Sequence, residues 1–148
     1  MSLCLRYTGN DADALEVLNT GFYKVFKNLD KYDKTRATVY TWIRTIIINS
    51  CLDFIKSRTT RMEWKELDQA VGVDLPPDVF SKISSAEILR LVRQLPPATQ
   101  AVFNLYVMDG YTHREIATML GTSEGTSKWH LSESRRILQK LLKGDNAK

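Results

Sequence analysis

Apolar residues recur at steps of three and four along most of the chain, which is the pattern of amphipathic helices. In the first half, this pattern predicts a helix over residues 13–29 and another over 38–58, separated by the turn-forming residues 29–33. The run Ile46-Ile47-Ile48 alone would favour a strand, but the helical spacing along the whole segment outweighs that preference. The predicted apolar sides comprise Leu15, Leu18, Phe22, Val25, Phe26 and Leu29 in the first helix, and Val39, Trp42, Ile43, Ile46, Ile47, Ser50 and Phe54 in the second.

The second half predicts four helices between residues 85 and 142. Ser85 is expected to cap the first of them, and Pro96 to end it. Pro97 then suits the first turn of the next helix, and Gly110 lies past its end. The expected inward residues of these two helices are Ile88, Leu89, Val92 and Leu95, and then Val102, Phe103, Tyr106 and Val107. We therefore predict an all-α protein whose C-terminal part is a four-helix domain.

Residues 112–142 predict two helices around a tight turn. Thr112 and Glu115 have the spacing of a capping box, Gly121 suits a helix end, and Ser123 is a good N-cap for the next helix. Two helices joined by a Gly-containing turn form a helix-turn-helix, whose second helix enters the DNA major groove. An ordinary helical hairpin is the alternative, but caps, small residue and glycine all fall at the offsets of the DNA-binding motif.

The second helix of this motif carries the candidate DNA contacts. If Ser123 caps it, Lys128, Trp129 and Ser132 share the exposed face near the helix start, where they can reach base edges. Arg135 and Arg136 follow about a turn later, where the helix is expected to leave the groove and pass the phosphate backbone. Residues 113–143 hold six Lys/Arg against three Glu, and this excess favours phosphate attraction. Leu131, Ile137, Leu138, Leu141 and Leu142 are expected to point toward the core.

Charge divides the chain of 148 residues, whose net charge is +4, into three parts. Residues 31–61 hold seven Lys/Arg against two Asp, whereas residues 62–89 hold two Lys against six acids. The acidic part contains Gly72, Pro76 and Pro77 and has no sustained helical period, which is typical of a linker. We therefore predict domains over 1–60 and 85–143, joined by a linker over 61–84.

Basic and aromatic residues also alternate in the second predicted helix. Lys56 and Arg58, together with Tyr40 and Trp42, suit single-stranded nucleic acid, whose unpaired bases stack on rings. Trp42 could equally belong to the core, and for Phe54 the core interpretation is favoured.

The sequence offers no chemistry for catalysis. Cys4 and Cys51 form no CxxC pair and indicate thiols in a reducing cytoplasm, and His113 and His130 lack metal-ligand spacing. No apolar run reaches membrane-spanning length, and no signal peptide is visible. We expect a cytoplasmic protein that is not an enzyme and that holds neither a cofactor nor a metal.

Longer stretches of the chain resemble a known family. The −35-binding domain of extracytoplasmic-function (ECF) sigma factors, a branch of the sigma-70 superfamily, is similar to LPPATQAVFNLYVMDGYTHREIATMLGTSEGTSKWHLSESRR (95–136). That family's −10-binding and polymerase-binding domain is similar to DADALEVLNTGFYKVFKNLDKYD (11–33) and WIRTIIINSCLDFIKSR (42–58). Asn49 and Asp53 match the family's Asn-x-x-x-Asp spacing, and GTSKWHLSE resembles members typical of Bacteroidota.

The resemblance implies a non-catalytic factor that joins core RNA polymerase and directs it to promoter DNA, with an anti-sigma factor as a further partner. The polymerase contacts would be Asp13, Glu16, Asn19 and Phe22; the −10 contacts Tyr40, Trp42, Asn49, Asp53, Lys56 and Arg58, with the loop 30–38; and the −35 contacts Ser123, Lys128, Trp129, Ser132, Arg135 and Arg136. The alternative is a helix-turn-helix transcriptional regulator that does not act through core polymerase. A third interpretation is a degenerate member that survives only as a partner of an anti-sigma factor.

Several positions depart from the family pattern. Leu15, Asn19 and Thr20 replace two acidic residues and a longer amide on the presumed polymerase-binding surface. Glu133 replaces a common arginine and should repel phosphate, and Ser127 stands where many relatives have valine. The resemblance also implies a helix upstream of this region, so we expect part of the first core to be uncovered.

Overall fold

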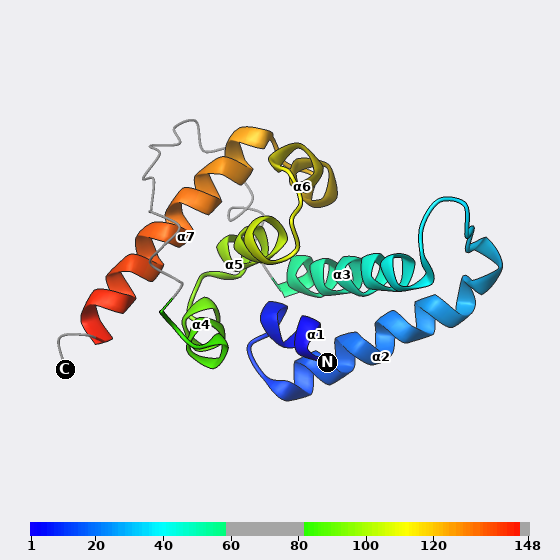
Figure 1. Ribbon diagram of the computed structural model, residues 1–148, viewed down its shortest axis with the longest axis horizontal. Helices are drawn as coiled ribbons and strands as arrows, with labels where there is room; N and C mark the ends of the chain where they lie inside the picture. Colours follow the sequence, from blue (N-terminus) through cyan, green and yellow to red (C-terminus); the bar gives the residue numbers. More distant parts are fainter. Residues whose placement is uncertain (59–81, 146–148) are drawn as a thin grey trace. The chain divides into compact units, whose positions relative to one another are not determined.

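The structure is a computed structural model that describes residues 1–58 and 82–145, so most of the predicted linker lies outside the described residues. Every regular element of the described residues is helical, which confirms the all-α prediction (Figure 1). The chain divides into two compact units after Arg58. The first unit contains α1 (Ser2–Tyr7), α2 (Asp11–Lys27), a 3-10 turn (Leu29–Lys31) and α3 (Val39–Arg58); the second contains α4 (Ser85–Val92), α5 (Pro97–Phe103), a π-helical turn (Asn104–Met108), α6 (His113–Leu120) and α7 (Glu124–Asp145).

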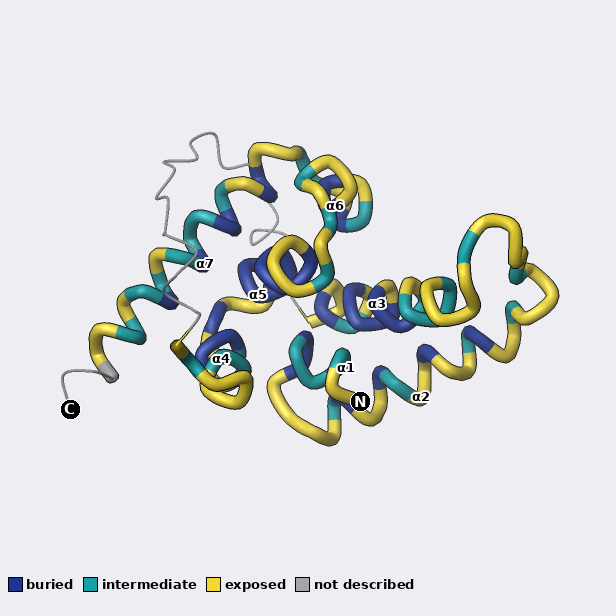
Figure 2. Tube along the Cα trace, in the orientation of Figure 1, coloured by how far each residue is buried: buried dark blue, intermediate teal, exposed yellow. Residues whose placement is uncertain are grey.

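In the first unit, α2 and α3 lie side by side in opposite directions (Figure 1). Gly21 lies at their contact, where an added Cβ would come within 2.5 Å of Ile47 Cδ1 and 3.5 Å of Ile47 Cα. Small side chains allow this close approach. The side of α2 that is buried against the rest of the unit therefore carries small residues: Ala14, Val17, Gly21 and Val25 (Figure 2).

This packing corrects the predicted apolar side of α2. Leu15, Phe22, Phe26 and Leu29 are exposed, and Leu18 is half-buried. Of the six apolar residues expected on that side, only Val25 is fully buried. The reason is that the larger residues lie beside the small ones around the helix. Only the small ones leave room for α3 to approach closely, so the small residues are buried and the larger ones stay exposed.

The buried side of α3 is also rotated from the predicted one. It comprises Ile47, Ile48, Ser50, Cys51, Leu52 and Ile55. Val39 at the helix start is exposed, and Trp42, Ile43, Ile46 and Phe54 are half-buried. Phe54 is therefore not a core residue, and its ring lies 4.2 Å from the guanidinium carbon of Arg58.

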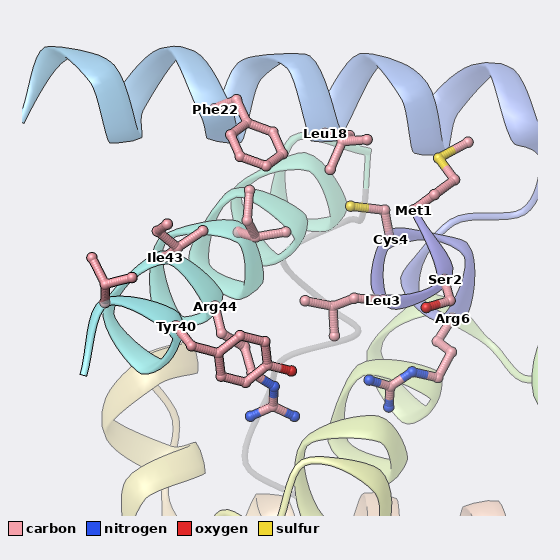
Figure 3. Close-up of a pocket in the computed structure, with 12 residues that line it drawn as sticks. Met1, Ser2, Leu3, Cys4, Arg6, Leu18, Phe22, Tyr40, Ile43 and Arg44 are labelled. Carbon is pink, nitrogen blue, oxygen red and sulfur yellow. The ribbon is translucent and has the colours of Figure 1, made fainter. Parts of the chain in front are cut away.

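Helix α1 was not predicted. It packs on both α2 and α3 and buries Cys4 and Tyr7. Thr8 ends the helix, because its hydroxyl donates to the carbonyl of Cys4 at 3.0 Å. A cavity of about 460 Å³ lies beside α1 and is lined by all three helices, with Leu18 and Phe22 from α2 and Ile43 from α3 (Figure 3).

In the second unit, the predicted helices are present with shifted ends. Ser84, not Ser85, caps α4, and it forms a capping box with Glu87. Helix α4 ends at Val92, before Pro96, while Pro97 begins α5 as predicted.

The residues predicted to point inward after α5 differ from those that do, because a π-helical turn follows this helix. The amide of Asp109 donates to the carbonyl of Asn104 at 2.9 Å, which is the five-residue step of a π-helix. This wider turn rotates the chain, so that Asn104 and Leu105 are buried while Tyr106 and Val107 are exposed. Gly110 follows with a positive φ of 77°, a conformation that glycine adopts without steric cost.

Candidate nucleic-acid interface

The predicted caps of the helix-turn-helix are all present. The Thr112 hydroxyl accepts from the Glu115 amide at 3.2 Å, and the Glu115 carboxylate accepts from the Thr112 amide at 2.8 Å. Gly121 ends α6 with a φ of 67°, in the left-handed region. Ser123 then caps α7, since its hydroxyl accepts from the amide of Thr126 at 3.1 Å. The short turn between these caps sets the angle at which α7 leaves α6.

Helix α7 packs against α5 and α6 partly through small and polar residues. Leu131 and Leu138 are buried as predicted, while Ile137, Leu141 and Leu142 are half-buried. The polar residues that α7 buries are Thr126, Ser127, His130 and Ser134. His130 is satisfied there, because its Nδ1 lies 3.0 Å from the hydroxyl of Thr99 on α5.

His113 and Ser127 join the two helices of the motif. Nδ1 of His113, the first residue of α6, lies 2.8 Å from Oγ of Ser127 on α7. The His113 ring stacks on Tyr106 at a centroid distance of 4.5 Å. Burial, reinforced by the nearby cations of Lys128 and Arg135, lowers the pKa of His113 below its ordinary value. Burial and these cations therefore favour the neutral imidazole at this position. Sequence reasoning missed this contact, although a histidine and an unexpected serine fourteen residues apart carry its signal.

The outer side of α7 carries most of the residues expected to meet the −35 element. Lys128 is exposed, and Trp129 and Ser132 are half-buried at the neighbouring helical positions. The Trp129 ring meets the His130 ring edge-on at 4.9 Å, which holds the indole against the helix. Arg135 is half-buried one turn further along. Ser123 differs from the others, because its hydroxyl is engaged as the cap.

Glu133 and Arg136 form an ion pair on α7. Arg136 Nε donates to the Glu133 carboxylate at 2.9 Å, and this hydrogen bond lowers the pKa of Glu133. The negative charge of Glu133 is thus balanced within the helix. The same contact engages the guanidinium that the sequence assigned to phosphate.

The six residues expected at the −10 element do not form one cluster. Trp42, Asn49, Asp53 and Lys56 follow one stripe of α3 at steps of seven, four and three. Tyr40 is exposed on a different side, where it lines the cavity with Arg44 (Figure 3). Tyr40 and Lys56 lie sixteen positions apart along the helix, a rise of about 24 Å.

Trp42 contacts the loop before α3. Its ring lies 5.2 Å from that of Tyr32 at an angle of 48°, and the Tyr32 hydroxyl donates to the carbonyl of Ala37 at 3.0 Å. Tyr32 therefore links the loop 32–37 to the start of α3, a role that the sequence did not suggest. Trp42 is half-buried, so it is neither a full core residue nor a fully exposed ring for stacking on bases.

Two ion pairs connect α2 with α3. Lys24 Nζ lies 3.2 Å from Asp53 Oδ2, and Arg58 Nη1 lies 3.3 Å from Asp13 Oδ2. Arg58 and Asp13 had been assigned to different partners, and here they bind each other. Exposed pairs of this kind contribute about 0.2–1 kcal/mol, so a partner could displace them.

The residues expected to bind polymerase are likewise divided. Asn19 and Phe22 lie on the exposed side of α2, in the series Leu15, Asn19, Phe22 and Phe26 at steps of four, three and four. We call Leu15, Phe22 and Phe26, together with Leu29 of the 3-10 turn that follows the helix, the apolar face of α2. Phe26 is its most exposed member, at 69%. Glu16 is exposed beside the face, and Asp13 points to another side of the helix, toward Arg58.

Within residues 1–58 and 82–145, no helix is long and apolar enough to cross a membrane. No group of three or more His, Cys, Asp or Glu side chains suited to a metal ion occurs in the same part of the chain.

Comparisons with known proteins identify the family. Sigma-70 region 2 matches residues 1–61, and sigma-70 region 4 matches residues 85–138. The ECF RNA polymerase sigma factor SigE of Mycolicibacterium smegmatis is 28% identical over 145 residues, which are 95% of this chain and 56% of that protein. SigW of Bacillus subtilis, also an ECF sigma factor, is 28% identical over 95% of this chain and 81% of its own length.

A solved structure shares the fold. The sigma factor RpoE of Bartonella quintana, crystallised with the anti-sigma factor NepR, has a TM-score of 0.63 and 18% identity, and the match covers 96% of this chain and 88% of that one. The chain spans about half the length of several curated relatives that it matches, 56% and 53% for two of them. Because both sigma-70 regions match in order and together take in both helical units, the chain belongs to the sigma-70 family, within its ECF group.

Proposed function

We propose that the protein is a transcription initiation factor that binds core RNA polymerase through its first unit and reads promoter DNA through both units. One observation carries this proposal: a chain with a complete helix-turn-helix also exposes an apolar face on α2, in the unit matched by sigma-70 region 2. A DNA-binding regulator that does not act through polymerase would have to use that second surface in another way, such as dimerisation. This role places the protein in the cytoplasm and requires no catalysis of its own.

The apolar face of α2 is the proposed polymerase-binding surface. Leu15, Phe26 and Leu29 are each more than half exposed, at 51%, 69% and 54%. Contiguous exposed apolar residues mark interaction sites, and buried aromatic anchors dominate the binding energy of most interfaces. Leu15, where relatives carry an acid, enlarges this face and makes apolar contact its main source of affinity. Asn19 and Glu16 would supply polar contacts at its edge.

The outer side of α7 is the proposed −35-reading surface. Lys128, Trp129 and Ser132 lie within the first three turns of the helix that a helix-turn-helix inserts into the major groove. Arg135 lies beyond them and is assigned to phosphate. Arg136 can join it only by exchanging the carboxylate of Glu133 for a phosphate, so its contribution should be smaller.

The stripe of α3 and the loop before it are the proposed −10-contacting surface. Trp42, Asn49 and Lys56 offer a ring, an amide and a cation along one side of the helix, which suits an extended strand with unstacked bases. Tyr40, on another side, would contact a base only where the strand passes around the helix start. Asp53 and Arg58 hold α3 to α2 through their ion pairs, which leaves them a supporting role.

An anti-sigma factor is the proposed regulator. The solved relative from Bartonella quintana is a complex with such a factor. The exposed apolar face of α2 is a surface that an inhibitor would have to cover in order to block polymerase.

Promoter-specific transcription with purified core polymerase tests the proposed function. We expect the chain to start RNA synthesis at promoters selected from a random −35/−10 library, and core polymerase alone to give no defined start sites. Retention of DNA binding without polymerase association or defined starts would instead support the regulator.

A further inference from the structure

The first unit holds a pair of buried sulfur atoms that the proposed function does not use. Cys4 lies on α1 and Cys51 on α3, and each residue is 0% exposed. The Cys51 thiol donates to the Cys4 sulfur, with the two Sγ atoms 3.9 Å apart. A disulfide needs a separation of about 2.05 Å, so the sulfurs must move roughly 2 Å closer. Side-chain rotation and a small shift of the short helix α1 can supply such a movement.

The environment of Cys4 favours reaction at this sulfur. The hydrogen bond from Cys51 lowers the pKa of Cys4 to about 7, against the opposing effect of burial. A thiolate is the nucleophilic form of cysteine, and a neighbouring thiol within bonding reach is what a resolving cysteine requires. The pair therefore combines a nucleophile with its resolving partner.

A small oxidant would approach Cys4 through the cavity beside α1, followed by a local opening of that helix. Cys4 is among the residues that line the cavity of about 460 Å³ (Figure 3). Helix α1 has six residues, and a helix of that length is held by its packing rather than by its own hydrogen bonds. Its local opening would expose Cys4 without unfolding α2 and α3.

We propose that Cys4 and Cys51 form a peroxide-sensitive dithiol, which hydrogen peroxide converts into a disulfide joining α1 to α3. The Cys4 thiolate attacks one peroxide oxygen, the O–O bond breaks, and the leaving hydroxide takes a proton to become water. The Cys4 sulfenic acid is then attacked by the sulfur of Cys51, which loses its proton. The S–S bond forms and a second water leaves. Two thiols give up two electrons, and one peroxide becomes two waters.

The cross-link would change the stability of the first unit. It would close a loop that contains the whole of α2, and closing such a loop restricts the unfolded chain. The oxidised first unit should therefore unfold at a higher temperature than the reduced one, with the difference removed by a dithiol reductant.

The test treats the reduced full chain with hydrogen peroxide under native conditions, then alkylates and digests it. We expect both thiols to disappear together and a peptide linking Cys4 to Cys51 to appear at the mass of two lost hydrogens. Peptide-level masses separate this product from oxidised methionine. Dithiothreitol should restore both thiols and lower the unfolding temperature again.

Single variants identify the roles of the two sulfurs. In Cys51→Ser the reaction should stop at the Cys4 sulfenic acid, which a 1,3-dione probe traps, and in Cys4→Ser no sulfenic acid should accumulate at Cys51. If the native chain kept both thiols while the urea-unfolded chain reacted, the pair would be inert core and the proposal would be overturned. A cross-link between two copies, in place of the internal one, would overturn it as well. The wild-type thiol count decides the matter even if a variant fails to fold.

Discussion

His113 on α6 and Ser127 on α7 bond to each other across the helix-turn-helix, with Nδ1 and Oγ 2.8 Å apart. Ser127 is 1% exposed, at a position where the family pattern suggested an apolar residue. The serine therefore occupies a core position and needs a polar partner, which the first residue of α6 provides. This bond, with the stacking of His113 on Tyr106, ties the reading helix to the helix before it.

The first prediction measures this coupling. Ser127→Ala and His113→Ala should each lower the free energy of unfolding by about 1–2 kcal/mol, because the first leaves half-buried His113 and the second leaves buried Ser127 without its polar partner. The double variant should lose less than the sum of the two, by roughly 0.5–1.5 kcal/mol. Urea unfolding of the four proteins gives the cycle, with exposed Thr118→Ala on α6 as the matched control. Additive losses would mean that the two side chains do not interact in solution.

The second prediction concerns pH. Burial lowers the pKa of His113 in the folded state below the ordinary value of 6.5, so the unfolded chain binds a proton more readily. Stability from the neutral ring is then fully present above that value and is lost as the pH falls through the folded pKa. The unfolding temperature of the wild type should fall as the pH drops below 6.5, and His113→Gln should reduce that pH dependence. An unchanged pH profile in the variant would assign the dependence to other groups.

The third prediction concerns the apolar face of α2. Phe26→Asp should weaken association with core polymerase at least tenfold, or roughly 1.4 kcal/mol, because it places a charge in the centre of an apolar contact. Lys27→Asp lies on another side of the same helix and is exposed, outside every residue assigned to polymerase, so it should have little effect. Co-elution and titration with labelled core polymerase measure both, and circular dichroism verifies that α2 is intact. Equal weakening by the two variants would point to charge rather than to this face.

The fourth prediction separates base reading from phosphate binding on α7. Lys128→Ala should relax preference at one or two base pairs, at a cost of about 1–3 kcal/mol for the preferred base. Arg135→Ala should lower affinity for all sequences alike and reduce the salt slope by about one. Competition binding across −35 variants, repeated at several salt concentrations, distinguishes the two outcomes. If Lys128→Ala, Trp129→Ala and Ser132→Ala all kept the same base preference, α7 would not be the reading helix.

The fifth prediction concerns the ion pair between Glu133 and Arg136. Glu133→Gln should strengthen binding to all promoter sequences, because it removes a negative charge near phosphate and releases Arg136 from its carboxylate partner. The gain should steepen the salt dependence and should shrink when Arg136→Ala is added. The matched control is Glu87→Gln, which removes the same charge. Glu87 belongs to the cap of α4 and not to the outer side of α7. Weaker binding of Glu133→Gln would show that the pair positions Arg136 for DNA.

The helix-turn-helix could be predicted almost completely, because its signals are local. The hydroxyl of Thr112, the left-handed Gly121 and the hydroxyl of Ser123 satisfy backbone groups only a few residues away. Such hydrogen bonds depend little on the rest of the fold. The candidate DNA-contacting residues on α7 follow from the same caps, because the helix start fixes which side each later residue occupies.

Which side of each helix is buried could not be predicted in the same way. The spacing of Phe22 and Phe26 suits a core, yet α2 buries Gly21 and Val25 beside them because α3 approaches the small residues closely. After α5, the wider turn that begins at Asn104 rotates the chain, so that Leu105 is buried and Tyr106, which the sequence predicts to be inside, is exposed.

The sequence by itself determined where helices begin and end around the DNA-binding motif, since capping is a contact between near neighbours in the chain. The tertiary structure decided the pairing of His113 with Ser127, of Arg58 with Asp13 and of Cys4 with Cys51, residues that are far apart in the chain. It also decided that the large apolar residues of α2 face outward. Each of these depends on which helices pack together and how closely, and periodicity along one helix carries no information about the shape of its neighbour.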